Sequence, residues 1–133
     1  MIKKNVEYTD FNGEKRTETL YFNLTEAELM DMELSEDGGL SERLTKIIEN
    51  DDKAGLLRFL KEFILNSYGE KSEDGRRFVK NDTIRSEFAQ TEAFSKLLMD
   101  MLTDEKAAAD FVNGIVPASL KEYASKMAAP ESK

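Results

Sequence analysis

The sequence predicts an α+β fold that is predominantly α-helical, with an N-terminal β-hairpin packed on a bundle of about five to seven helices. Apolar residues alternate over residues 2–24, which is typical of β-strands. Beyond residue 24 they recur three and four residues apart, and helix-capping residues separate the repeats. We find no internal repeat and no long linker, so we expect residues 1–133 to form a single domain.

The hairpin prediction comes from the parity of the apolar residues. They occupy even positions before and after the expected turn, namely Ile2, Val6, Tyr8, Leu20, Phe22 and Leu24. A two-residue turn at Asn12-Gly13 would pair even with odd positions and split the apolar set between two faces. The parity therefore favours a three-residue loop, Phe11-Asn12-Gly13, with Gly13 in the left-handed conformation and a bulge.

The first helix has a complete start signal. Thr25 is the expected N-cap, Glu28 its capping-box partner, and Leu24 with Leu29 a hydrophobic staple. We expect a left-handed cap at Gly38-Gly39 to end this helix. The predicted buried stripe consists of Ala27, Met30 and Leu34.

Two further helices follow directly. The second presents one apolar face, made of Leu40, Leu44, Ile47 and Ile48. Residues 50–52, Asn-Asp-Asp, should break it and cap the third helix over residues 53–67. That third helix is the most apolar segment and the expected centre of the core, and Gly69 should stop it. Its apolar residues are Leu56, Phe59, Leu60, Phe63 and Ile64.

Residues 70–80 are expected to form a loop. The segment is polar except for Phe78 and Val79 and contains the turn signal Ser-Glu-Asp-Gly at residues 72–75, which also occurs at residues 35–38. Phe78 would fold this loop over the core.

The C-terminal part of the chain is expected to be helical as far as residue 127. A short helix should begin near Asp82, with Ile84 and Phe88 one turn apart. Another should begin near Thr91, with a stripe of Phe94, Leu97, Leu98 and Met101.

The next helix start is expected at residues 103–105, where Thr103 would be the cap and two acids would follow it. Asn113-Gly114 should close that helix and Pro117 should mark a break. A second capping box, Ser119 with Glu122, predicts a final helix carrying Leu120, Ala124 and Met127. Residues 128–133 should be frayed.

The composition excludes several classes of binding partner. Twenty-seven acidic against nineteen basic residues give a net charge of −8, which disfavours nucleic acid and anionic membrane surfaces as partners. Acids and bases interleave, unlike the ordered carboxylates of a DNA mimic. No stretch approaches the ~18 apolar residues of a membrane span, so we expect a soluble protein that is not exported.

No catalytic or metal-binding motif stands out. The chain lacks cysteine and histidine, which removes the commonest thiol nucleophile, the commonest general base and the best transition-metal ligands. The paired acids at residues 49–52 and 73–74 lie beside turn residues, where solvated acids are expected. Neither segment has the ligand spacing of an EF-hand, and no phosphate-binding glycine loop occurs. We expect no enzyme, no metal and no cofactor.

A protein-binding surface is the remaining possibility. Met99 and Leu102 fall on the flank of the predicted helix over residues 92–102, beside its buried stripe. Met32 similarly lies off the stripe of the first helix. Methionine adapts to irregular apolar partners, so Met32, Met99 and Leu102 are the candidate partner-binding residues. The alternative is that all three complete a core wrapped on several sides.

Three segments resemble phage tail assembly chaperones. They are Lys-Lys-Asn-Val-Glu-Tyr-Thr-Asp-Phe-Asn-Gly-Glu at residues 3–14, Leu-Tyr-Phe-Asn-Leu-Thr-Glu-Ala-Glu-Leu at residues 20–29, and Phe-Val-Asn-Gly-Ile-Val-Pro at residues 111–117. Their order relative to the segment Ser-Tyr-Gly-Glu-Lys-Ser at residues 67–72 also resembles the order in that family. The resemblance covers about residues 3–123.

The resemblance implies a protein without enzymatic activity in the cytoplasm of the infected bacterial host. Such chaperones coat the tape measure protein, keep it soluble, and give way as tail tube subunits polymerise, so they are not expected in the mature virion. Many members self-associate, and many have a longer frameshifted form. The alternatives from composition are a generic acidic adaptor, an antitoxin-like inhibitor or a virion connector.

Overall fold

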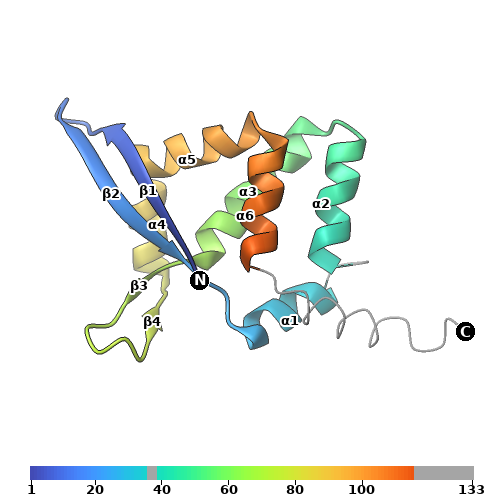
Figure 1. The fold of residues 1–133 in the computed structure, drawn as a ribbon, viewed down its shortest axis with the longest axis horizontal. Helices are drawn as coiled ribbons and strands as arrows, with labels where there is room; N and C mark the ends of the chain where they lie inside the picture. The colour runs from blue at the N-terminus through green and yellow to red at the C-terminus, as the bar shows by residue number, and fades with distance from the viewer. Residues whose placement is uncertain (36–38, 116–133) are drawn as a thin grey trace, which may run out of the picture.

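The structure, a computed structural model, describes residues 1–35 and 39–115. Within these ranges it contains four strands and six helices, so the predicted α+β, mostly helical fold is confirmed. The sheet lies at one side of the molecule and the helices fill the other (Figure 1). The elements are β1 (Ile2–Thr9), β2 (Lys15–Phe22), α1 (Glu26–Ser35), α2 (Gly39–Glu49), α3 (Lys53–Ser67), β3 (Tyr68–Lys71), β4 (Phe78–Val79), α4 (Asp82–Ala89), α5 (Glu92–Leu102) and α6 (Glu105–Ile115).

The N-terminal hairpin has the predicted parity. β1 and β2 pair antiparallel with even positions opposite even ones, as in Ile2 opposite Phe22. The backbone N–H of Asp10 donates to the carbonyl of Glu14 at 2.8 Å, which closes the loop of residues 11–13. Gly13 has φ +82°, so the expected left-handed conformation is confirmed.

Helices α5 and α6 cover the inner side of β1 (Figure 1). Val6, Leu20 and Phe22 are buried there. At the start of the strand the approach is close, because a Cβ atom built on Gly114 of α6 would lie 2.8 Å from Cδ1 of Ile2. The helices therefore complete a hairpin that would be only marginally stable alone.

The prediction of a loop at residues 70–80 was wrong for residues 70–71 and 78–79, which form strands. β3 follows α3 directly and pairs antiparallel with β2, while β4 pairs with β3, so the sheet has the order β1-β2-β3-β4. Residues 72–77 and Lys80 remain outside the strands, with Gly75 at φ +74°. Short strands carry little alternation, and here β3 forms by pairing with the distant edge of β2 while β4 forms by pairing with β3.

The absence of a side chain at Gly69 allows β3 to pack closely against the β4 segment. It is buried, and a Cβ atom at this position would lie 2.6 Å from the ring of Phe78 and 2.8 Å from Cγ of Lys80. A side chain here would push the β4 side of the hairpin away. The helix itself ends at Ser67, and Gly69 serves the close approach of two strands.

The capping box of α1 is confirmed. The Thr25 backbone N–H donates to Oε1 of Glu28 at 2.8 Å, and the Glu28 backbone N–H donates to Oγ1 of Thr25 at 3.1 Å. Leu24 and Leu29 are both buried, as a hydrophobic staple requires. The start of α1 was therefore predictable from local sequence.

The predicted buried stripe of α1 was wrong. Ala27 and Leu34 are exposed and Met30 is only half-buried, whereas Leu29 and Glu33 point into the molecule. Compared with the prediction, the helix is rotated about its axis so that Glu33 faces inward. There, Oε1 of Glu33 accepts a buried hydrogen bond of 2.7 Å from the backbone N–H of Leu40 at the start of α2. A pattern based on apolar residues alone treats such a carboxylate as solvent-facing.

The junction between α1 and α2 depends on Gly39. Its φ is +87°, and a Cβ atom here would lie 2.6 Å from Oε2 of Glu33. The left-handed conformation expected at Gly38-Gly39 is thus found at Gly39, which begins α2; Gly38 lies outside the described residues.

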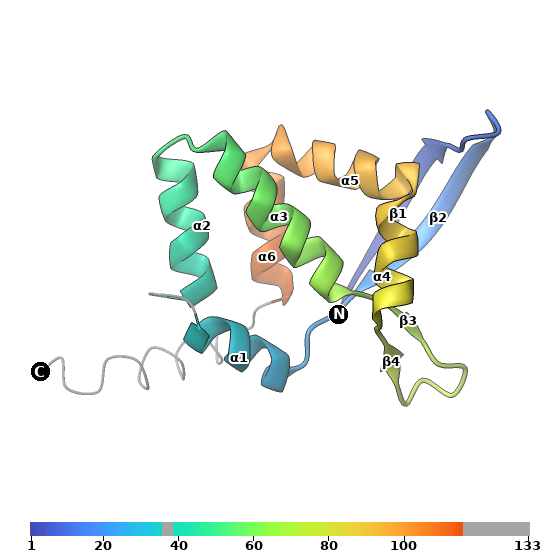
Figure 2. The same cartoon turned by 180° about the vertical axis from the view of Figure 1, so that it is seen from behind.

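Helix α3 forms the centre of the core (Figure 2). Asp52 caps it by accepting the backbone N–H of Gly55 at 2.9 Å, and the predicted range of residues 53–67 is confirmed. The core is rich in aromatic rings: Phe22 and Phe63 each contact Phe111 edge to face, at centroid distances of 5.3 and 6.0 Å. All five predicted core residues of this helix are buried, namely Leu56, Phe59, Leu60, Phe63 and Ile64.

The remaining helices begin as predicted with one exception. Asn81 and Thr91 cap α4 and α5. For α6, however, the side chain of Asp104 accepts the backbone N–H groups of Lys106 and Ala107, whereas Thr103 donates its hydroxyl back to Met99. The cap is Asp104, because Thr103 still belongs to the end of α5.

The predicted end of α6 was also wrong, since the helix continues through Asn113-Gly114 to Ile115. Packing of Gly114 against β1 stabilises the helix where its local propensity is low. The predicted break at Pro117, the capping box of Ser119 and Glu122, and the final helix carrying Leu120, Ala124 and Met127 lie outside the described residues.

Candidate partner-binding site

The three candidate residues lie in two separate places. Met99 and Leu102 belong to α5, whereas Met32 belongs to α1 at the opposite end of the helical part in both views (Figures 1 and 2). Met99 is 49% exposed, and Met32 and Leu102 are half-buried against the core. The structure therefore does not join them into one patch, and Met99 is the most accessible of the three.

Met99 lies in a groove between β1 and α5, which we call the β1–α5 groove. Its volume is about 500 Å³. β1 and α5 line opposite sides of it, so the groove runs along the edge of the sheet. The lining residues are Glu7, Tyr8, Thr9, Glu92, Ser95, Lys96, Met99 and Asp100.

A second hollow of about 510 Å³ continues the groove along β1 from Thr9 back to Lys4. It shares Glu7, Lys96 and Asp100 with the first and reaches Ala107 of α6. The two hollows together follow most of β1, which is an edge strand because β2 is its only partner in the described sheet. An edge strand offers backbone N–H and C=O groups to an additional segment.

The charges of the β1–α5 groove are mixed. Nζ of Lys96 lies 3.5 Å from Oδ2 of Asp100, and both side chains are more than half exposed. Burial, a hydrogen bond with Glu18 and the charge of Glu18 raise the pKa of Tyr8, which stays protonated at neutral pH. The groove thus combines an apolar methionine with exposed charges of both signs.

Met32 lines a smaller hollow of about 170 Å³ between α1, α2 and α3. Leu40, Phe59 and Phe63 lie beside it, and all three are buried. A hollow of this size is too small for a protein segment, so the environment of Met32 is that of a core margin.

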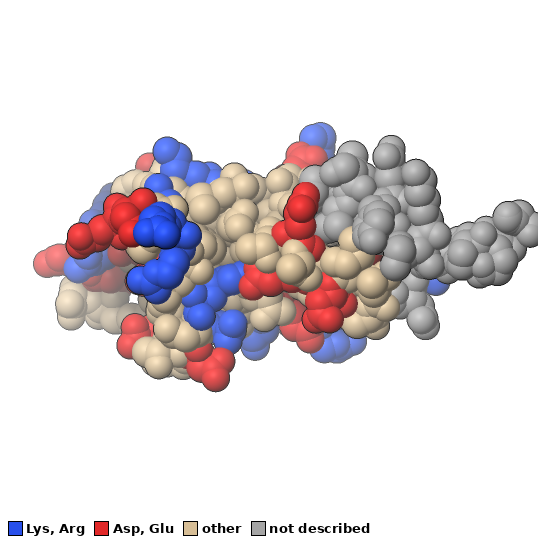
Figure 3. All heavy atoms as spheres, turned by 90° about the horizontal axis from the view of Figure 1, so that it is seen from below, with Lys and Arg blue, Asp and Glu red and all other residues tan. Residues whose placement is uncertain are grey.

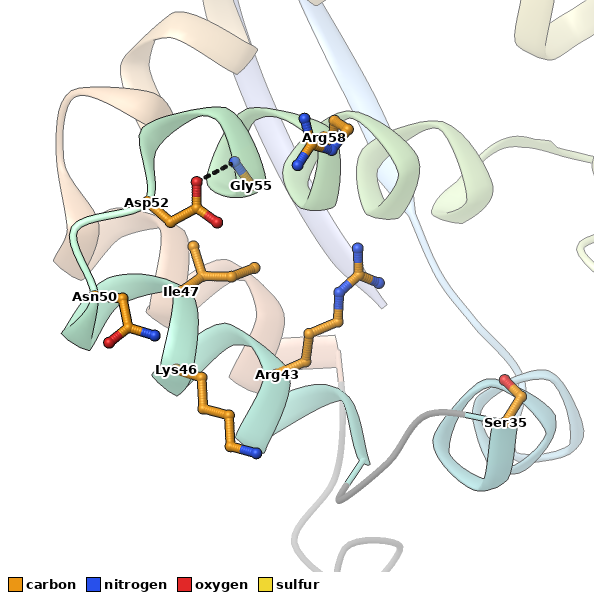
Figure 4. Close-up of a pocket in the computed structure, with 8 residues that line it drawn as sticks. All are labelled: Ser35, Arg43, Lys46, Ile47, Asn50, Asp52, Gly55 and Arg58. Carbon is orange, nitrogen blue, oxygen red and sulfur yellow. Dashed lines mark hydrogen bonds between the residues drawn. The ribbon is translucent and has the colours of Figure 1, made fainter.

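Sequence reasoning missed a cationic pocket between α2 and α3. It measures about 550 Å³ and opens near the end of α1 (Figure 4). Three basic side chains line it, against one carboxylate. The residues are Ser35, Arg43, Lys46, Ile47, Asn50, Asp52, Gly55 and Arg58. The three bases come from two helices, so only the three-residue spacing of Arg43 and Lys46 was visible in the sequence.

The remaining surface is charged and mixed. Acidic and basic side chains are interspersed around an uncharged central area on the face shown in Figure 3. No group of three or more histidine, cysteine, aspartate or glutamate side chains within residues 1–35 and 39–115 is placed to hold a metal ion. None of the helices in the same ranges has the length and apolar character needed to span a bilayer.

The fold and these surfaces define an acidic, mostly helical α+β protein whose accessible features are open grooves. In a comparison with protein families, the model of the phage tail assembly chaperones matches residues 1–133, the whole chain. The chain belongs to this family, which implies a role in tail assembly and the binding of phage tail proteins. Searches of curated proteins and of solved structures found no match.

Proposed function

We propose that this protein binds the tape measure protein of its phage, keeps it soluble in the cytoplasm of the infected host, and is displaced when tail tube subunits assemble. It acts by binding and without catalysis. The observation that carries the proposal is the family match over the whole chain.

The β1–α5 groove is the surface that we assign to the tape measure protein. Met99 is half exposed there although its neighbours Leu97 and Leu98 are buried. A flexible methionine in an open groove suits a long apolar client whose contacts differ along its length. Both strand edge and helix flank are accessible at this place.

The net charge of −8 supports the same function. Many copies of a chaperone on one long client must stay dispersed, and like charges on their outer faces oppose association into aggregates.

Co-expression tests the proposal. The tape measure protein encoded in the same phage genome should be insoluble alone and should co-purify as a soluble complex when this chain is present. Met99→Asp should reduce the yield of the complex, while Lys61→Asp, an exposed change on α3, should not. A tape measure protein that stays insoluble and unbound would overturn the proposal.

Purified phage particles provide a second test. A chaperone that is displaced during assembly should be missing from mature virions, so mass spectrometry should detect tube and tape measure peptides but none from this chain. Stoichiometric recovery in virions would instead identify a connector component.

A further inference from the structure

The cationic pocket is unusual for an acidic protein. Arg43, Lys46 and Arg58 all line one hollow, although acidic residues outnumber basic ones in the chain by eight. In the described part of the chain, neither Lys46 nor Arg58 forms an ion pair. The local charge of the pocket is therefore opposite to that of the molecule.

Arg43 is held in position by its neighbours. Its guanidinium lies 5.0 Å from the centroid of the Phe59 ring, and Nη1 lies 3.9 Å from Oε1 of Glu62. Figure 4 shows this guanidinium pointing from α2 toward α3, the helix that carries Arg58. Arg43 is therefore already engaged with α3, which leaves Lys46 and Arg58 as the bases that a partner would meet.

The single acid of the pocket does not cancel these charges. Asp52 uses Oδ1 to accept the backbone N–H of Gly55 at 2.9 Å, as the cap of α3. Its carboxylate is engaged by the helix end, whereas Lys46 and Arg58 form no ion pair within the described residues. Ile47 adds an apolar surface to the lining.

We propose that this pocket binds an acidic segment of a partner protein, with Lys46 and Arg58 receiving its carboxylates and Ile47 contacting an apolar residue beside them. The inference rests on the proposed function in one respect, that the partner is a protein. The pocket lies on α2 and α3, separate from the β1–α5 groove, and supplies a cationic anchor, whereas the charges of the groove are mixed.

A carboxylate segment fits better than a nucleic acid. A phosphate backbone carries one charge per nucleotide over its whole length and would meet the net negative charge of the rest of the molecule. A short run of glutamates or aspartates presents its charges only at the pocket. The attraction acts over about one Debye length, ~10 Å at 0.1 M salt.

An NMR titration tests the proposal. Uniformly ¹⁵N-labelled protein is titrated with a capped octaglutamate peptide, which serves as the acidic probe. Shift changes should concentrate on the amides of residues 43–58 and disappear at about 0.5 M NaCl, where screening is strong. The double variant Lys46→Glu/Arg58→Glu should weaken binding at least about tenfold.

The matched control is Lys15→Glu/Lys61→Glu, which changes the net charge equally at exposed positions outside the pocket. It should alter the affinity less than about twofold. Shift changes spread over all basic residues, equal weakening by both double variants, or equally strong binding of an octathymidylate would each overturn the proposal. Peptide binding without rescue of the tape measure protein would refute the proposed function alone; rescue without peptide binding would refute only this inference.

Discussion

At the scale of single residues, neighbouring positions on α5 have opposite environments. Leu97 is 6% exposed and Met99 is 49% exposed. Leu97→Asp should abolish the cooperative thermal unfolding transition, because an unpaired carboxylate would be buried in the core. Met99→Asp should retain that transition and weaken binding of the tape measure protein. Calorimetry and co-purification of the two variants measure both effects.

Leu102→Asp should fall between these two variants. The sequence placed Leu102 with Met99 on the flank of the helix, but the structure packs it partly against the core. We expect a lower melting temperature together with weaker binding. A Leu102→Asp protein as stable as wild type would show that its contacts with the core contribute little.

Gly39 and Gly75 form a matched pair for a test of the α1–α2 junction. Both have positive φ, but a Cβ atom at Gly75 meets nothing within 4 Å, whereas one at Gly39 meets the carboxylate of Glu33. Gly75→Ala should cost about 1 kcal/mol of unfolding free energy from the backbone alone. Gly39→Ala should cost about 1–3 kcal/mol more, since Glu33 must release the Leu40 N–H. Urea denaturation distinguishes these values, and equal losses would contradict the role of Glu33.

At the scale of secondary-structure elements, Lys80 ties three segments together. Its Nζ donates to Oε1 of Glu28 at 2.8 Å and to the backbone carbonyls of Asn23 and Asn66 at 3.1 and 3.3 Å. Burial favours the neutral form of Glu28, but hydrogen bonds from Lys80 and Thr25 and the charge of Lys80 outweigh it. The pKa of Glu28 is therefore below its ordinary value.

This depressed pKa predicts a pH dependence. Because Glu28 binds protons more weakly when folded, its contribution to stability is complete above its unfolded pKa of about 4.3 and is lost as pH falls through the lower folded value. Glu28→Gln retains a hydrogen-bond acceptor for the cap without the charge. Its unfolding free energy should fall less steeply than wild type between about pH 5 and 3. Glu26→Gln, in the same exposed turn, should follow the wild-type slope; identical slopes for all three proteins would refute the prediction.

Local signals predicted elements well and pairings poorly. The caps at Thr25, Asp52 and Thr91 were visible because each needs only its own side chain and a backbone group three residues on. β3 was missed since its strand form depends on pairing with β2, more than forty residues earlier, and β4 was missed since it depends in turn on pairing with β3. The rotation of α1 was missed because it depends on the distant N–H of Leu40.

At the scale of the whole molecule, α3 should be the most protected element. It contacts α2, α4 and α5, and the side chains of Leu60 and Ile64 have no exposed surface. Amide hydrogen exchange should be slowest for these residues, with an opening free energy close to that of global unfolding. It should be much faster for α1, which has few buried side chains. Equal protection of both helices would indicate that α1 unfolds only with the core.

The candidate surfaces differ in how many secondary-structure elements form them, and this decides whether the sequence could predict them. The exposure of Met99 followed from helical spacing, because it depends on one helix. The β1–α5 groove required the packing of a strand against a helix, and the cationic pocket required residues from α2 and α3. Surfaces shared between elements have no local signature, so composition offered only the net charge.

The contact between Ile2 and Gly114 has a consequence for synthesis on the ribosome. β1 is translated first, yet the helices that cover it, α5 and α6, are translated after every other element that the structure describes. At a translation rate of roughly 5–20 residues per second, the hairpin stays uncovered for on the order of ten seconds. During that interval the charged side chains on the edge strand disfavour pairing with a neighbouring nascent chain. These residues are Lys3, Lys4 and Glu7.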